Sequence, residues 1–63
     1  MKFSELEVVR TKKDIPEKGI KKGDTGTIIV AFTKPNEAYE VEFIFDVYNP
    51  KFAVFLPDEI EKV

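Results

Sequence analysis

The sequence of 63 residues contains no cysteine, no histidine and no tryptophan. Without cysteine there is no disulfide, and without cysteine and histidine the common zinc sites are excluded. The same absences remove the usual general base and thiol nucleophile of enzymes. Ser4 is the only serine and has no base as a partner. We therefore expect a protein that is not an enzyme and that uses no metal or cofactor.

Two groups of carboxylates could in principle carry chemistry, one as an acid pair and one as a calcium site. Glu40 and Glu42 lie two residues apart on an expected strand and so share one face, where they could imitate the acid pair of a glycosidase. An exposed polar strand face explains them fully, however, and so small a domain has no cleft for a sugar. Asp14, Glu17 and Asp24 could hold calcium, but their spacing does not match an EF-hand loop.

Long apolar runs are also missing. The longest are residues 28–32 and 52–56, five residues each, whereas a membrane-spanning helix needs about 20. No segment near Met1 resembles the apolar core of a signal peptide, and the lack of cysteine suits a reducing compartment. These features predict a soluble cytoplasmic protein that does not contact a membrane.

The chain is long enough for one domain, residues 1–63, and a domain of this size buries only about 60% of its unfolded surface. Six phenylalanines and two tyrosines supply the bulk of a core, unless a partner subunit completes it. Strands are expected at residues 7–11, 27–32, 38–45 and 52–56, followed by a 3₁₀ turn at 57–59 and a brief last strand through Ile60. Residues 12–23 form a long polar loop, in which Ile15 and Ile20 should pin the loop to the core. Segment 14–17 is biased against helix by Pro16.

Clean alternation makes 38–45 the clearest strand, with Tyr39, Val41, Phe43 and Phe45 on one face. The nearly continuous apolar run at 27–32 indicates a strand covered on both faces. The expected core comprises Val8 or Val9, Ile28, Val30, Val41, Phe43 and Val54. Five short strands with one long early loop predict an all-β, SH3-like barrel. An OB-type barrel is the alternative, although it usually needs more residues and a helix.

The loop enters the second strand through a glycine turn, formed by Gly19, Gly23, Asp24 and Gly26. Gly23 can adopt the positive φ of a tight turn, and Asp24 can bond the backbone two residues ahead. Gly26 leaves room for a second backbone to pass closely or for a bulge.

Charge is distributed unevenly around a net value of −2. Residues 1–36 carry eight basic and five acidic side chains, and residues 37–63 carry two and seven. The basic residues of the long loop, together with Arg10 of the strand before it, are the candidate partner-binding residues: Arg10, Lys12, Lys13, Lys18, Lys21 and Lys22. Such a cluster can meet phosphates or an acidic protein, or can simply keep the loop solvated.

Two aromatic residues, Phe32 and Tyr48, lie at a strand end and in a turn. Their size favours burial, and Tyr48 is the one aromatic that we add to the candidate partner-binding residues. A groove for polyproline segments is not expected, because such grooves are lined by aromatic side chains and the chain has no tryptophan.

The sequence resembles a bacterial family catalogued as domain of unknown function 4926. The resemblance rests on residues 6–9 (Leu-Glu-Val-Val), 14–17 (Asp-Ile-Pro-Glu), 19–21 (Gly-Ile-Lys), Gly23, 26–28 (Gly-Thr-Ile) and 38–43 (Ala-Tyr-Glu-Val-Glu-Phe). It covers most of the chain and implies a small β-barrel. It implies no catalytic or ligand-binding residue.

Two shorter resemblances bear on function. Residues 21–28 (Lys-Lys-Gly-Asp-Thr-Gly-Thr-Ile) resemble a KOW motif, which occurs in ribosomal and transcription-elongation proteins that touch RNA or protein. Residues 39–43, 52–53 and 56–60 are similar to the small barrel subunit of photosystem I and related docking barrels. We therefore expect a protein-interaction or accessory module, with a KOW-like RNA-binding module as the alternative. The sequence leaves the partner and the oligomeric state open.

Overall fold

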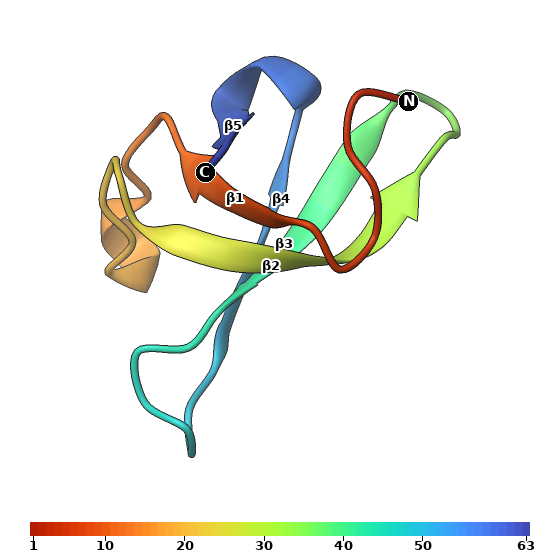
Figure 1. Cartoon of the computed structure of the whole chain (residues 1–63). Helices are drawn as coiled ribbons and strands as arrows, with labels where there is room; N and C mark the ends of the chain where they lie inside the picture. The colour runs from red at the N-terminus through yellow and green to blue at the C-terminus, as the bar shows by residue number, and fades with distance from the viewer.

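Apolar and polar residues alternate along β3 (Ala38–Phe43), an inner strand of the only sheet in the computed structural model, which describes residues 1–63. The other strands are β1 (Val8–Thr11), β2 (Thr25–Phe32), β4 (Lys51–Phe55) and β5 (Ile60–Lys62). All pairs are antiparallel, in the order β4-β3-β2-β1-β5 (Figure 1). The prediction of an all-β fold with five strands is confirmed. No helix is long and apolar enough to cross a membrane.

The longest strand, β2, holds the sheet together because it pairs with β1 near its start and with β3 along most of its length. Its register against β3 shifts between Ile28 and Val30, so that Ala31 and not Val30 lies opposite Tyr39. Ala31 consequently packs against the core, whereas Val30 is only half-buried. The prediction of Val30 as a core residue, and of a strand fully covered on both faces, was therefore wrong. A bulge of this kind reverses the face that each later residue occupies.

One hydrophobic cluster lies on the inner side of the curved sheet. Its ten buried members are Phe3, Val9, Ile20, Ile28, Tyr39, Val41, Phe43, Ala53, Phe55 and Ile60. Aromatic rings meet edge to face at two places, with centroid distances of 5.4 Å for Phe3–Tyr39 and 5.9 Å for Phe43–Phe55. Such contacts add stability beyond the area that the rings bury.

The inward face of β4 differs from the prediction. Ala53 and Phe55 lie opposite Val41 and Tyr39 and are buried, while Val54 is 56% exposed. A run of five apolar residues carries no alternation that would reveal its phase. The pairing with β3 decides the phase, because residues directly opposite each other point to the same face.

The long loop between β1 and β2 is attached to the core as predicted. Ile20 is fully buried and Ile15 packs against the cluster, and the two residues exchange backbone hydrogen bonds of 2.8 and 3.2 Å. Ile15, with φ −130° and ψ 82°, is not helical, as expected before a proline, but the next residues form a single 3₁₀ turn, η1 (Pro16–Lys18). The bias against helix thus ends at Pro16, whose fixed φ suits the first position of a helical turn.

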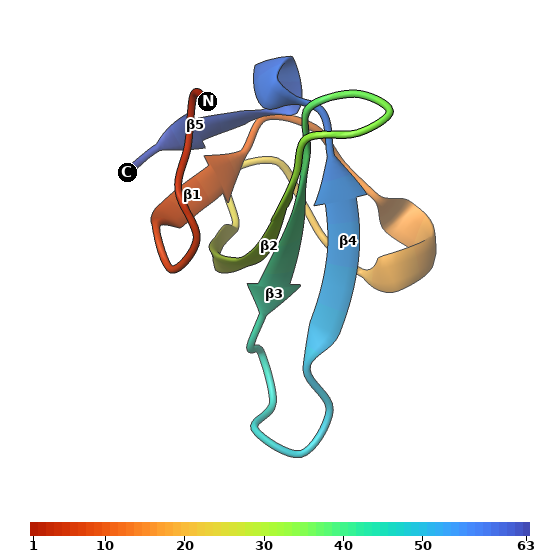
Figure 2. The same ribbon diagram turned by 90° about the vertical axis from the view of Figure 1, so that its right-hand side faces the viewer.

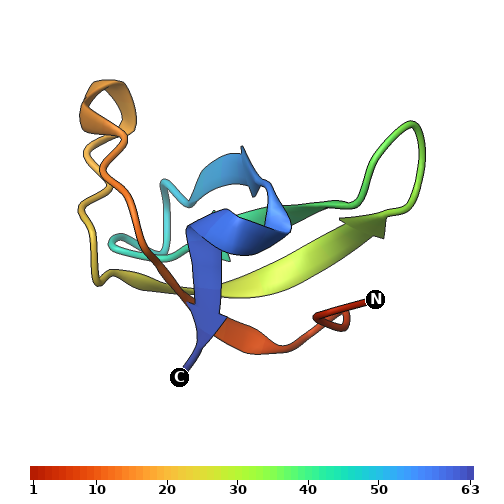
Figure 3. The same cartoon turned by 90° about the horizontal axis from the view of Figure 1, so that it is seen from above.

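The two ends of the chain lie beside the sheet rather than away from it. Phe3 is buried, and its backbone N–H donates to the Tyr39 hydroxyl at 3.1 Å. A second 3₁₀ turn, η2 (Pro57–Glu59), leads into β5 as predicted. Seen from above, the β1–β2 loop and the β2–β3 loop lie at opposite ends of the molecule (Figure 3).

Candidate interaction surface

The connection between β3 and β4 projects from the body of the protein (Figure 2). We call residues 44–50 the hairpin tip. Its large apolar side chains face solvent, with exposed fractions of 60% for Ile44, 76% for Val47 and 88% for Tyr48. The expected burial of Tyr48 was wrong, and Phe32 is also partly exposed, at 38%. The hairpin tip therefore presents an apolar surface to solvent, and these three side chains are not part of the hydrophobic core.

The sequence predicts a different structure for two residues of the tip, Ile44 and Phe45. Residues 44 and 45 continue the alternation of β3, so they were expected to extend the strand, whereas β3 ends at Phe43 and Phe45 is 51% exposed. The residues from Asp46 to Pro50 predict a turn, and the structure has a turn there. What the sequence did not indicate is the exposure of the apolar side chains around it.

Asp46 fixes the shape of the tip. Its carboxylate accepts hydrogen bonds from the Tyr48 backbone N–H at 3.0 Å and from the Asn49 side-chain amide at 3.2 Å. The Asn49 backbone N–H donates to the Asp46 carbonyl at 3.0 Å. The bond from Tyr48, followed by the bond from Asn49, lowers the pKa of Asp46. A carboxylate in such a turn accepts hydrogen bonds from the backbone that would otherwise lack a partner. These bonds order the backbone of the tip, on which the apolar side chains are carried.

Phe45 ties the tip to the core. Its ring stacks on that of buried Phe43, with a centroid distance of 6.1 Å and an angle of 10° between planes. On β4, the Lys51 Nζ atom lies 5.5 Å from the centroid of the Phe45 ring, within the range of a cation–π contact.

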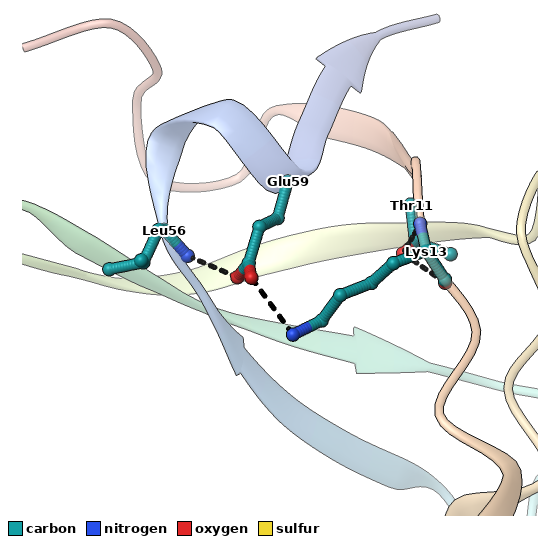
Figure 4. A network of polar contacts seen from close by, with 4 residues as sticks. All are labelled: Thr11, Lys13, Leu56 and Glu59. Carbon is teal, nitrogen blue, oxygen red and sulfur yellow. Dashed lines mark hydrogen bonds and ion pairs between the residues drawn. The ribbon is translucent and has the colours of Figure 1, made fainter.

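The basic residues predicted as a cluster fall into two groups. Arg10 and Lys13 are paired, with distances of 3.4 Å from Arg10 Nη1 to Glu61 and 2.9 Å from Lys13 Nζ to Glu59. Figure 4 shows that Glu59 also accepts the Leu56 backbone N–H, at 2.8 Å. Burial by itself raises the pKa of Glu59, but the bonds from Leu56 and Lys13 outweigh it, so this pKa is lowered.

Lys13 thus belongs to the contact that fastens η2 to the start of the long loop. The Thr11 hydroxyl supports it by donating to the Lys13 carbonyl at 2.8 Å and accepting the Lys13 N–H at 3.2 Å (Figure 4).

The second group forms no ion pair and is exposed: Lys12, Lys18, Lys21 and Lys22. Two neighbouring carboxylates bond the loop backbone instead. Asp14 accepts the Lys22 N–H at 2.7 Å, and Asp24 accepts the Lys21 N–H at 2.8 Å. The predicted bond from Asp24 to the backbone two residues ahead is replaced by this bond to a residue three positions earlier.

The glycine turn ends at Gly26, where β3 lies close to the backbone of β2. Gly23 has a φ of +96°, and its N–H donates to the Thr11 carbonyl at 2.8 Å. A Cβ atom on Gly26 would lie 2.6 Å from Val41 Cγ1 and 2.7 Å from the Glu42 carbonyl oxygen. No other residue fits at position 26 without moving β3.

Two hollows adjoin the long loop, and Gly19 lines both. The first, of about 410 Å³, lies between η1 and the start of β4 and is lined by Glu17, Lys18, Gly19, Pro50, Lys51 and Phe52. The second, of about 610 Å³, is lined by Asp14, Pro16, Gly19, Ile20, Lys21 and Lys22. Lys51 was not predicted to belong to this site, because it lies about 30 positions beyond the loop in the sequence.

No three carboxylates gather where they could hold a metal ion. Glu40 and Glu42 lie on the outer face of β3, opposite Val54 and Phe52 of β4. The charged groups near the loop are lysines and the carboxylates of Asp14, Glu17 and Asp24, and the lysines can attract an anionic group.

The protein is all-β, with five antiparallel strands in one sheet, an apolar hairpin tip and a basic loop. Residues 5–47 match the family described as Domain of unknown function (DUF4926), and the chain belongs to this family. The matched region runs from before β1 to Val47 in the hairpin tip. No curated protein and no solved structure matches the chain.

Proposed function

We propose that this protein is a non-enzymatic interaction module with an SH3-like barrel, and that it docks on another protein through the hairpin tip. The observation that carries the proposal is the exposure of Ile44, Val47 and Tyr48 on a projecting turn of fixed shape. Cytoplasmic location in a bacterium is part of the same proposal.

The strand arrangement supports an SH3-like barrel. The sheet order β4-β3-β2-β1-β5 places the first and last strands side by side, so β5 pairs with β1. The bulge between Ile28 and Val30 bends β2, the strand that joins the two halves of the sheet. A 3₁₀ turn before the last strand and one long early loop complete the pattern.

The hairpin tip supports contact with a protein. Exposed apolar side chains that lie together mark interaction sites more often than single ones do. Tyrosine is enriched among the residues that dominate binding energy at protein interfaces. Because Asp46 already orders the turn, a partner would not need to order it on binding, and that reduces the cost of association.

The KOW-like alternative draws on one observation, the exposed lysines without ion pairs in the long loop. Binding of single-stranded RNA also needs aromatic side chains on which bases stack. Tyr48 and Phe45 lie in the hairpin tip, outside the KOW-like segment 21–28. The apolar tip therefore favours protein contact over RNA contact.

Photocrosslinking tests the proposal. A photoreactive phenylalanine analogue is placed at Tyr48, and a matched control carries it at Asn36, an exposed residue of the β2–β3 loop at the other end of the molecule. Irradiation in the producing cell should give a discrete protein adduct from position 48 and none from position 36. The double substitution I44S/V47S should abolish the adduct while leaving the melting temperature nearly unchanged, because both side chains are exposed.

Two results would contradict the proposal. One is an adduct at position 48 that disappears on treatment with ribonuclease, which would favour the RNA alternative. The other is equal labelling from positions 36 and 48, which would mean that the tip is not a preferred contact.

A further inference from the structure

The two hollows beside the long loop carry a net positive charge, although the protein as a whole is acidic. Four lysines and two acids line them, which gives a net charge of +2, whereas the whole chain carries −2. The remaining charged side chains must therefore carry −4. Clefts lined by one sign of charge attract ligands of the opposite sign.

The four cations in the hollows are free to meet a ligand. None of Lys18, Lys21, Lys22 and Lys51 forms an ion pair within the protein. One of the two acids, Asp14, is bonded to the backbone N–H of Lys22 at 2.7 Å. By contrast, the basic residues outside the hollows include Arg10 and Lys13, which acids of the chain already neutralise.

Lys51 joins the first hollow to the hairpin tip. A Cβ atom on Gly19 would lie 2.7 Å from Lys51 Nζ, so the ammonium group lies directly over the glycine at the end of η1. The same ammonium faces the Phe45 ring at 5.5 Å. A ligand in the hollow is therefore adjacent to the base of the tip, and both surfaces can be covered by one partner.

From this arrangement we infer that the first hollow accepts an acidic segment of the partner protein, in which carboxylates alternate with apolar side chains. Lys18 and Lys51 meet the carboxylates, while Pro50 and Phe52, the latter 39% exposed, contact an apolar neighbour. The inference rests on the proposed function and names the chemistry of the segment that docks beside the tip.

A nucleic acid fits the same hollow less well. The only arginine, Arg10, is paired with Glu61, so no free guanidinium can bind a phosphate in the bidentate way. Glu17 lines the hollow and would repel a phosphate backbone, whereas side-chain carboxylates of a peptide can be spaced to avoid it. The hollow also offers a single aromatic ring, Phe52, and no series for base stacking.

Backbone amide spectra of the labelled full chain provide the test. The probes are a short peptide of Asp and Glu alternating with Leu and Phe, the same peptide with Lys in place of the acids, and a short oligouridine. The acidic peptide should shift the amides of Lys18, Gly19 and Lys51 and leave that of Lys34 in place. Binding should weaken as the salt concentration rises above about 0.1 M, where charges are screened beyond about 10 Å.

Two double substitutions with the same change in charge separate a site from general attraction. K18E/K51E should weaken the acidic peptide about fivefold or more, the effect of losing roughly 1 kcal/mol of ion pairing. The control K12E/K34E removes two exposed lysines that lie outside both hollows and form no ion pair, and it should change affinity less than about twofold. K18Q/K51Q replaces the first variant if its spectrum shows that charge reversal disturbs the fold.

Three outcomes would overturn the inference: equal weakening by the two double substitutions, equal shifts with the lysine peptide, or tighter binding of the oligouridine at the same amides. If the acidic peptide leaves the hollow unshifted while crosslinking at position 48 still yields a protein, the inference is wrong and the proposed function stands.

Discussion

The ammonium group of Lys51 lies 5.5 Å from the centroid of the Phe45 ring, which itself stacks on Phe43 of the core. One lysine thereby links three parts of the molecule: the core strand β3, the hairpin tip and the loop residue Gly19. The contact joins the apolar tip to the basic hollow, and it can be examined directly.

We expect the side-chain ε-methylene protons of Lys51 to resonate upfield of those of Lys34, because they lie within the ring current of Phe45. Proton spectra of the wild type and of Phe45→Leu measure the difference. The substitution should return the Lys51 signals to the position of Lys34. Identical signals for the two lysines in the wild type would show that Lys51 does not lie over the ring in solution.

Phe43→Ala should cost about 3–5 kcal/mol of unfolding free energy, most of the stability of so small a domain. Phe43 is fully buried and contacts the rings of Phe45 and Phe55. Val54→Ala is the control: this side chain is 56% exposed, so its loss should cost less than about 1 kcal/mol. Urea denaturation measures both, and a larger loss for Val54 would reverse the assigned face of β4.

Gly26→Ala should destabilise the protein by about 1–3 kcal/mol or more, because the new methyl group would overlap Val41 Cγ1 and the Glu42 carbonyl. A backbone oxygen in the middle of the sheet cannot move aside as a flexible side chain can. Thermal denaturation measures the effect.

Gly23 provides the contrast. A Cβ atom at this position would have no neighbouring atom within 4 Å, so what constrains the residue is its positive φ. Gly23→Asn should therefore cost less than Gly23→Ala, since asparagine tolerates such angles, whereas no choice of side chain should rescue position 26. Equal tolerance of alanine and asparagine at position 23 would contradict this account.

Tyr39 makes stability depend on pH at both ends of the scale. Burial, and then the hydrogen bond to Glu37, raises the pKa of Tyr39 above its ordinary value of 10.0, and the same bond is the main cause of the lowered pKa of Glu37. A raised tyrosine pKa contributes stability that is present below about pH 10 and is lost as the pH rises through the folded value. The lowered pKa of Glu37 contributes stability above its ordinary value of 4.5, which is lost on acidification.

Tyr39→Phe should therefore lower the free energy of unfolding at neutral pH by about 1–2 kcal/mol, because the N–H of Phe3 loses its acceptor. The melting temperature should fall accordingly. It should also flatten the fall in stability above about pH 10. Tyr48→Phe is the matched control, since Tyr48 is 88% exposed, and it should change neither. Melts recorded from about pH 3 to about pH 11 test both statements; an unchanged alkaline limb in Tyr39→Phe would refute the role of the phenol.

Local patterns in the sequence determined the strands and several of their details. Alternation at 38–43 placed Tyr39, Val41 and Phe43 on the buried face of β3, because side chains point to opposite faces with a period of two. Pro57 and the residues after it predicted the 3₁₀ turn before β5. These features depend on neighbours a few residues apart, so the chain reveals them without any knowledge of the fold.

Only the tertiary structure decided the phase of β4, the bulge in β2 and the division of the basic residues. Lys13 and Arg10 are neutralised by acids 46 and 51 residues away, and Lys51 reaches the loop only because β4 begins beside η1. The hairpin tip is exposed because β3 ends at Phe43 and the turn held by Asp46 carries the next residues away from the core. Each of these outcomes depends on which distant segments pair, and pairing is set by the packing of the whole sheet rather than by the residues next to each position.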